Sequence, residues 1–469
     1  MLPDADNCQQ SPIAETCSTP EPRFFIAPWH FSAFFCALML VVGLTGYGLL
    51  DPDEGRYAEI PREMIELRDF VTPRLNYVPY LEKPPLLYWA TAGAFMLFGD
   101  DPLVLRLVPA ICGILGMLVA WWLTLLCFGK YSARWAPSII ATSVVYFVVA
   151  RIPIIDTMFS MLLAAALTAW LAGEHRQGSR RYAMWIISGL LLGGALLAKG
   201  PVAVVLFGAI VVGYLLWTRR PLMIFAAAGL PVLLSVAVFL PWVFAIQRAT
   251  PEFYHYFFIV QHVQRFLGNG IPEHVQPFYY YIVVLPLGFM LWSFYWPGMV
   301  RGALRHKWTD LPPAFRRDTV FLIIWFVVIM VFFSASSCKL AQYILPAWWP
   351  ISAVMAAWLR REFCISNPRR RLYVPTTLTA VFVALMMAGM IIYAGRQDLI
   401  PALMLQRPLL IFVICGVISF GLLMFTSWLS NRHWSIAQLA IGAILPFAGM
   451  LPAMHVITSV KDMNGLIPP

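Results

Sequence analysis

The chain has 469 residues, of which 60% are hydrophobic and only 12% are charged, and its mean hydropathy is +0.74. Soluble domains carry about 25% charged residues, so this composition excludes a large soluble protein. The net charge is +10, but Lys and Arg occur in short clusters between apolar runs. That distribution is typical of membrane topology and excludes a nucleic-acid-binding stripe.

Long apolar runs predict an all-α polytopic membrane protein, because about 18 consecutive apolar residues suffice for a membrane-spanning helix. We expect about 13 such helices. Their approximate ranges are 26–49, 103–128, 133–151, 154–173, 181–198, 200–217, 222–246, 277–300, 318–336, 343–360, 373–395, 408–429 and 434–455.

The distribution of Lys and Arg predicts the orientation of these helices. Loops after the even-numbered helices are basic, so they are expected in the cytoplasm. Residues 1–25 then form a cytoplasmic tail, 26–455 the transmembrane domain, and 456–469 a short periplasmic tail. The sequence has no Asn-x-Ser/Thr site, which favours a bacterial inner membrane over the secretory pathway.

Two external segments, 50–102 and 249–276, are unusually long. In the first, Asp53 can cap a short helix that runs to Glu59, and Pro61 can open a second helix that ends at Leu67. Residues 84–98 are apolar but too short to cross a bilayer, and an interfacial helix fits them better.

The first external segment opens with the densest group of charges, in Asp51-Pro52-Asp53-Glu54-Gly55-Arg56-Tyr57-Ala58-Glu59. Carboxylates beside an Arg at the membrane surface suit general-base chemistry or the binding of a polar head group. The alternative is a solvated helix with internal ion pairs. A second group, Glu82-Lys83-Pro84-Pro85, offers a Lys that could meet a lipid phosphate or could simply extend its amine to water.

Two further candidates lie at the external ends of predicted spans. Asp156 is deep enough that ionisation is costly without a partner, which makes it a functional candidate. Its alternative is a pair with Arg151 that shapes the turn. Lys199 could be a second phosphate ligand or a residue that merely reaches for the interface.

The second external segment adds His262 and Arg265. Arg265 could hold a phosphate, and His262 could bind a metal together with a carboxylate or could be an ordinary hydrogen-bonding residue. The last candidate is the external corner at residues 336–346, which contains Lys339 and Tyr343.

All five groups fall on the predicted external side, and no charged residue lies near the middle of a predicted span. Transporters usually place ionisable groups near the midplane, so the pattern counts against a flippase for a lipid-linked sugar. A non-catalytic lipid-binding scaffold would leave the carboxylate-rich first segment without a task.

The motifs Pro52-Asp53-Glu54-Gly55-Arg56-Tyr57-Ala58-Glu59, Glu82-Lys83-Pro84-Pro85, and Lys339 followed by Tyr343-Ile344-Leu345-Pro346 resemble the bacterial aminoarabinose (4-amino-4-deoxy-L-arabinose) transferase family. That family is related to the protein O-mannosyltransferases and has the GT-C glycosyltransferase fold. Its members carry a soluble periplasmic domain after the last span, and this chain ends soon after its last apolar run.

The resemblance implies the roles of individual residues. It implies Asp53 as the catalytic carboxylate and Asp156 as a second functional one. Phosphate or substrate binding is implied for a larger set, namely Arg56, Tyr57, Lys83, Lys199, Arg265, Lys339 and Tyr343. It implies no obligatory cofactor, but it associates a divalent metal such as zinc with Glu82 and a loop His, here His262.

The resemblance also implies the reaction. A sugar would pass from undecaprenyl phosphate to a lipid A phosphate, or to another periplasmic glycan or protein acceptor, with inversion at the anomeric carbon. Such transfer modifies lipopolysaccharide and gives polymyxin resistance. Asp53 would orient or deprotonate the acceptor, and cations would stabilise charge on the leaving phosphate.

Overall fold

The computed structural model describes residues 28–45, 53–268, 274–290, 292–305 and 312–364, with scattered positions between 374 and 421. This part of the chain is helical apart from one two-stranded hairpin. The tails at 1–25 and 456–469, most of the predicted spans 373–395 and 408–429, and all of the predicted span 434–455 lie outside the described residues.

Five helices among the described residues are long and apolar enough to cross a membrane. They are α4 (Pro102–Phe128), α8 (Ile155–Glu174), α9 (Gly178–Lys199), α11 (Gly229–Ala249) with the preceding π-helix η2 (Ile224–Ala228), and α15 (Pro313–Ala335). A bent pair, α13 (Tyr280–Phe289) and the segment of η4 (Ser293–Tyr295) and α14 (Trp296–Arg305), makes an angle of 101°. The five long helices match predicted ranges, whereas the predicted span at 277–300 is broken between α13 and η4. The predicted count of 13 is not established.

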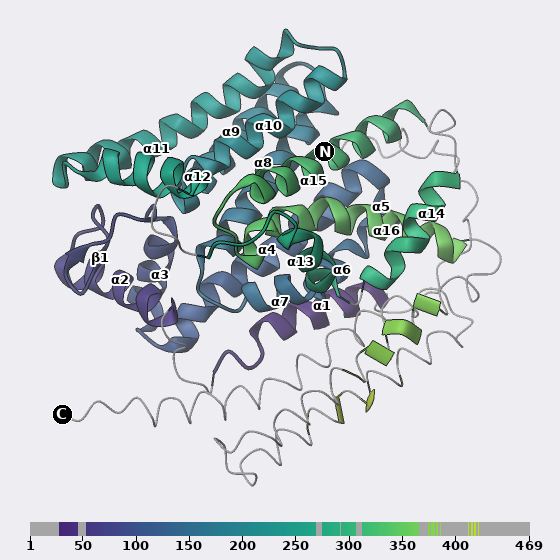
Figure 1. The fold of residues 1–469 in the computed structure, drawn as a ribbon, viewed down its shortest axis with the longest axis horizontal. Helices are drawn as coiled ribbons and strands as arrows, with labels where there is room; N and C mark the ends of the chain where they lie inside the picture. The colour runs from purple at the N-terminus through teal and green to yellow at the C-terminus, as the bar shows by residue number, and fades with distance from the viewer. Residues whose placement is uncertain are drawn as a thin grey trace.

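Shorter helices complete the bundle. They are α1 (Pro28–Val41), α10 (Val202–Trp217) and α16 (Trp348–Cys364), the last continuing the 3-10 helix η6 (Ala341–Ala347). In Figure 1, α9, α10 and α11 form a layer above α4, α8, α15 and α16.

Helix α8 lies at the centre of this bundle. In its apolar window, 94% of the residues are buried inside the protein. It packs along α9, which in turn packs along α11. The contact of α9 with α11 is close because it uses glycines: a Cβ at Gly193 would lie 2.7 Å from Cβ of Val238. Shape-matched helix packing with small residues at the contact is how membrane helices associate.

The predicted span at 133–151 is wrong as a single helix. The chain forms three short helices there, α5 (Lys130–Ala133), α6 (Ala136–Ala141) and α7 (Val144–Val149). At the break, Thr142 and Ser143 donate their hydroxyl hydrogens to the carbonyls of Ser138 (2.6 Å) and Ile140 (2.7 Å). Such side-chain bonds compete with the helical ladder.

The first external segment forms α2 (Asp53–Leu67), a hairpin of β1 (Arg74–Leu75) and β2 (Val78–Pro79), and α3 (Leu86–Phe98). The expected interfacial helix at 84–98 is present as α3. The expectation of two helices before it is wrong, because α2 continues through Pro61. Burial of Ile60 and Met64 in the core holds the helix together despite the missing N–H of the proline.

Two ion pairs lie at the C-terminal end of α8, about five turns after Asp156. Arg220 Nη2 lies 2.6 Å from Glu174 Oε2, and His175 Nε2 lies 2.8 Å from Asp318 Oδ1. Burial lowers the pKa of His175, but the hydrogen bond and negative charge of Asp318 outweigh burial and leave that pKa above its usual value. We call this side of the bundle the Glu174 end.

Candidate functional site

The predicted site residues gather at the opposite end of the bundle, which we call the Lys83 end. Lys83 precedes α3, Asp156 lies in the first turn of α8, and Lys199 is the last residue of α9. The π-helix η3 (His255–Gln264) and α12 (Arg265–Leu267) bring Arg265 to the same place. Figure 1 shows α12 above the segment of α2, β1 and α3, on the left of the view.

Asp156 and Lys199 form an ion pair in which both side chains are largely buried. The ammonium of Lys199 also lies 4.2 Å from the ring centroid of Tyr343 and 5.2 Å from that of Phe159. The alternative in which Asp156 pairs with Arg151 is wrong. Arg151 instead donates to the carbonyl of Met39 at 2.6 Å.

The charge of Lys83 depends on this environment. Burial, the dominant cause, and the nearby charges of Arg265 and Lys199 lower the pKa of Lys83 to about 8, against the opposing effects of Glu82 and Asp156. A lysine whose charge is penalised by neighbouring cations gains most when an anion binds. We call Lys83, Lys199, Arg265 and Asp156 the cation cluster, and Glu82 lies beside it.

His262 lies beside the cation cluster and packs on Gly200. Its Nδ1 is 2.6 Å from the carbonyl oxygen of Phe257. Gly200 has φ +94°, and a Cβ there would lie 2.8 Å from Nε2 of His262, so only glycine allows this approach. Burial, followed by the charges of Lys83 and Arg265, lowers the pKa of His262 despite its hydrogen bond to Phe257.

Among the residues that the structure describes, no complete set of ligands for a divalent metal comes together, and the pairing of Glu82 with His262 as metal ligands stays a prediction. Within the described ranges, no three His, Cys, Asp or Glu side chains come together. One ring nitrogen of His262 faces a backbone carbonyl, and Glu82 accepts a hydrogen bond from the hydroxyl of Tyr80 at 2.9 Å. The cations that lower the pKa of His262 also oppose a bound cation. We therefore derive no catalytic step through a metal.

The first external segment borders the cation cluster through Tyr80. The guanidinium of Arg56 lies 6.0 Å from the ring centroid of Tyr80, whose hydroxyl donates to Glu82. Burial and the charge of Glu82 raise the pKa of Tyr80, so the phenol stays protonated. Arg56 and Glu82 thus act on Tyr80 in opposite directions, and the effect of Glu82 is the larger.

A buried ion pair that the sequence reasoning missed fixes the start of α2. Arg106 in the first turns of α4 donates through Nε (2.9 Å) and Nη2 (2.6 Å) to the two carboxylate oxygens of Glu54, and both side chains are fully buried. Its Nη1 also donates to the carbonyl of Leu44 at 2.9 Å. Asp53 is the first residue of α2 and directly precedes Glu54. The structure describes its backbone but not its side chain.

Two predicted binding residues occupy packing positions in this structure. Tyr57 is buried and stacks on Tyr88, with ring centroids 5.9 Å apart. Lys339 is buried, and its ammonium donates to the carbonyls of Gln276 (2.9 Å) and Ser336. Lys339 therefore joins the loop that contains Gln276 to the loop after α15.

The comparisons with known proteins agree with this geometry. Residues 82–244 match the family described as dolichyl-phosphate-mannose-protein mannosyltransferase. The undecaprenyl phosphate-alpha-4-amino-4-deoxy-L-arabinose arabinosyl transferase of Shewanella sediminis is 32% identical over 435 residues, which are 91% of this chain and 76% of that protein. The chain belongs to the aminoarabinose transferase family.

Other members give the same result. The corresponding transferase of Photorhabdus laumondii is 30% identical over 427 residues, 88% of this chain and 75% of its own length. The crystal structure of ArnT from Cupriavidus metallidurans bound to undecaprenyl phosphate superimposes with a TM-score of 0.78 at 26% identity, covering 92% of this chain and 77% of that one. The prediction of a membrane-embedded glycosyltransferase with a GT-C fold is therefore confirmed, and the flippase alternative has no support.

Proposed function

We propose that this aminoarabinose transferase moves a 4-amino-4-deoxy-L-arabinose-like sugar from undecaprenyl phosphate to a lipid A phosphate. The Lys83 end would face the periplasm, at the surface of the bacterial inner membrane. Relatives named for this donor and a similar structure bound to undecaprenyl phosphate support the donor. The acceptor and the exact sugar rest on the family resemblance.

The observation that carries the proposal is the cation cluster. Lys83, Lys199 and Arg265 come close enough together that Arg265 and Lys199 lower the pKa of Lys83 in spite of Glu82 and Asp156. Cations gathered in this way attract an anion, and the phosphate of a lipid-linked donor is such an anion.

The cluster would act mainly on the leaving group. As the bond between the anomeric carbon and the phosphate oxygen breaks, negative charge grows on undecaprenyl phosphate. Lys83 and Arg265 would stabilise that charge in the transition state more than in the ground state. Asp156 would hold Lys199 in position through the ion pair, with Tyr343 covering its ammonium.

Asp53 would act on the acceptor. An acceptor oxygen attacks the anomeric carbon from the side opposite the departing phosphate, so we expect inversion at that carbon. A hydroxyl acceptor needs deprotonation by Asp53, whereas a phosphate acceptor is already anionic and needs only positioning. The bidentate pair of Glu54 with Arg106 fixes the backbone that carries Asp53.

The test is mass spectrometry of lipid A from a strain that lacks its own transferase and expresses this chain or its Asp53→Asn variant. We expect an added aminopentose mass with the wild type and its loss with the variant, at equal amounts of membrane protein. Unmodified lipid A would overturn the proposed acceptor. If purified protein also released no undecaprenyl phosphate from the aminoarabinose-linked donor, the proposed donor would be wrong as well.

A further inference from the structure

A group of aromatic and charged side chains lies between the start of α2 and the cation cluster. The hydroxyl of Tyr80 donates to Glu82 at 2.9 Å, and the guanidinium of Arg56 lies 6.0 Å from the ring centroid of Tyr80. Beside them Tyr57 stacks on Tyr88, with ring centroids 5.9 Å apart. We call these five residues the tyrosine group. Aromatic rings with a few fixed polar groups are the usual lining of a small-molecule site.

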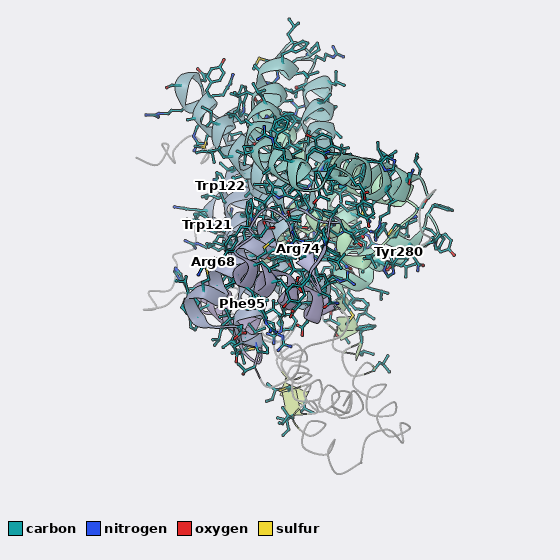
Figure 2. The ribbon with its side chains drawn as sticks, turned by 90° about the vertical axis from the view of Figure 1, so that its left-hand side faces the viewer. Arg68, Arg74, Phe95, Trp121, Trp122 and Tyr280 are labelled. Carbon is teal, nitrogen blue, oxygen red and sulfur yellow. The ribbon has the colours of Figure 1, made fainter. Side chains whose placement is uncertain are left out.

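The hydroxyl of Tyr88 indicates that this group binds a polar ligand. Its side chain is fully buried, and in the part of the chain that the structure describes the hydroxyl has no hydrogen-bond partner. Burial raises the pKa of Tyr88, the charge of Glu82 raises it further and Arg56 lowers it, so both charges are near. Figure 2 looks at the Lys83 end, where Arg74 of β1 and Phe95 of α3 mark this segment. A buried hydroxyl that no protein atom satisfies gains most when a ligand supplies the partner.

Glu82 is the carboxylate of the tyrosine group. One of its oxygens accepts the hydrogen bond from Tyr80, which holds the carboxylate in place. No cation forms an ion pair with Glu82 among the described residues, whereas Asp156 and Glu54 each have a basic partner within the chain. Glu82 is therefore the carboxylate at this end that can take a cationic partner from a ligand.

The tyrosine group lies between the two places that the proposed reaction needs. Asp53 precedes Arg56 and Tyr57 by three and four residues on α2, a spacing that puts these positions on one helix face. At the other end of the group, Glu82 is followed directly by Lys83 of the cation cluster. With the acceptor at Asp53 and the leaving phosphate at Lys83, the sugar between them meets the tyrosine group.

The charges at the Lys83 end match those of the proposed donor. An undecaprenyl phosphate-linked 4-amino-4-deoxy-L-arabinose has a negative phosphate at its anomeric carbon and a positive ammonium at C4, across the sugar ring. The cations around Lys83 suit the phosphate. The neighbouring carboxylate of Glu82 suits the ammonium, because a hydrogen bond between two ionised groups is stronger than a neutral one. A sugar with a hydroxyl at C4 would leave this carboxylate without its cationic partner, which is how a polar site discriminates against an analogue.

We propose that Glu82 determines which sugar is transferred, by pairing its carboxylate with the 4-ammonium of the lipid-linked aminopentose. The hydroxyl of Tyr88 forms a hydrogen bond with a hydroxyl group of the same sugar, and Tyr80 is a positioning residue that orients Glu82. The proposed function is a premise of this assignment, which names the group by which the transferase recognises its donor.

The test compares two undecaprenyl phosphate-linked donors, 4-amino-4-deoxy-L-arabinose and L-arabinose, which has a hydroxyl at C4. Transfer to lipid A by the purified full chain gives kcat/KM for each donor. We expect the wild type to prefer the aminopentose by about 10-fold to 100-fold, the typical effect of one hydrogen bond to a charged group. Glu82→Gln should lower kcat/KM for the aminopentose by that factor and leave the value for arabinose within about threefold, so the preference disappears.

Glu66→Gln is the matched control. Glu66 also accepts a hydrogen bond from a tyrosine hydroxyl, that of Tyr77 at 3.2 Å, but it lies near the other end of α2, so neither kcat/KM should change. Tyr80→Phe keeps the ring beside Arg56 and removes the hydroxyl, so it should reduce the preference without abolishing it.

Tyr88→Phe tests the second contact with the sugar. It should lower kcat/KM for both donors by about threefold to tenfold, because both sugars keep their other hydroxyl groups. The thermal unfolding midpoint should stay the same or rise, because the variant removes a buried hydroxyl that has no protein partner. Full activity of this variant would remove Tyr88 from the site.

Equal kcat/KM of the wild type for the two donors would overturn the assignment of Glu82 and leave the proposed transfer intact. No transfer from either donor would overturn the proposed function itself. An equal loss on both donors in Glu82→Gln would also overturn the assignment, because Glu82 would then support the fold or hold a metal. If Glu82→Gln does not fold, an unchanged preference in Tyr80→Phe would contradict the assignment.

Discussion

Charged side chains are arranged differently at the two ends of α8. At its first turn, Asp156 pairs with Lys199, and two further cations, Lys83 and Arg265, lie nearby. At its last turn, Glu174 pairs with Arg220, and His175 pairs with Asp318, so each charge has one partner. The helix dipole favours the acid at the first turn and opposes Glu174 at the last one, which makes Arg220 the more necessary partner.

This difference separates charges that hold helices together from charges that await a ligand. A paired charge contributes to stability when its partner stays in place. A group of like charges lowers stability in the empty protein and becomes favourable only when an anion binds. The same substitution, a cation replaced by Met, should therefore have opposite effects at the two ends.

The largest effect is expected for Lys83→Met at the Lys83 end. Loss of one cation beside the leaving phosphate should lower kcat/KM for the lipid-linked donor by about 100-fold to 1,000-fold. The thermal unfolding midpoint should stay the same or rise, because repulsion from Arg265 is relieved. A variant that loses activity and unfolds at a clearly lower temperature would break the comparison, since Lys83 would then be structural.

The reverse result is expected for Arg220→Met at the Glu174 end. The loss of its partner leaves Glu174 buried without compensation, and since Arg220 is itself 35% exposed we expect about 1–2 kcal/mol less stability. Thermal unfolding in detergent should show a lower midpoint, while kcat/KM stays within about twofold. Arg219→Met is the matched control, because Arg219 is the exposed neighbour and should change neither quantity.

The smallest expected effect is on the pH dependence of kcat/KM, and it tests the charge of the Lys83 ammonium alone. The pKa of Lys83 is lowered to about 8, so its ammonium is charged below that pH and neutral above it. We expect kcat/KM for the donor to fall as pH rises through about 8, and Lys83→Arg, which stays charged, to lack this fall. Equal pH profiles for the two proteins would show that another group controls donor binding.

The sequence predicted which residues meet at the Lys83 end better than it predicted what each one does. Asp156, Lys199 and Arg265 were identified because charges at the ends of apolar runs stand out. The pairing of Asp156 with Lys199 was not, because the two lie on different helices and only packing brings them together. Lys339 looked equivalent to Lys83 in the sequence, yet loop carbonyls surround its ammonium.

Arg106 shows what the sequence reasoning overlooked. It is one charge near the start of a long apolar helix, and such a residue needs a buried partner, so it could have been matched with a carboxylate of the preceding segment. The choice of Glu54 over Asp53 depends on the direction in which α2 leaves its first turn. Likewise, the run at 133–151 has ample hydropathy for a span, and only the hydroxyl bonds of Thr142 and Ser143 divide it.

The π-helix η3 has a consequence for how this family can diverge. Each turn of a π-helix contains more residues than a turn of an α-helix. The ten residues from His255 to Gln264 therefore set the distance and the rotation between Phe257 and Arg265. An α-helix over the same residues would rise and turn differently. A change in the length of η3 therefore moves the guanidinium of Arg265, whereas a substitution that keeps the π-helix leaves it in place.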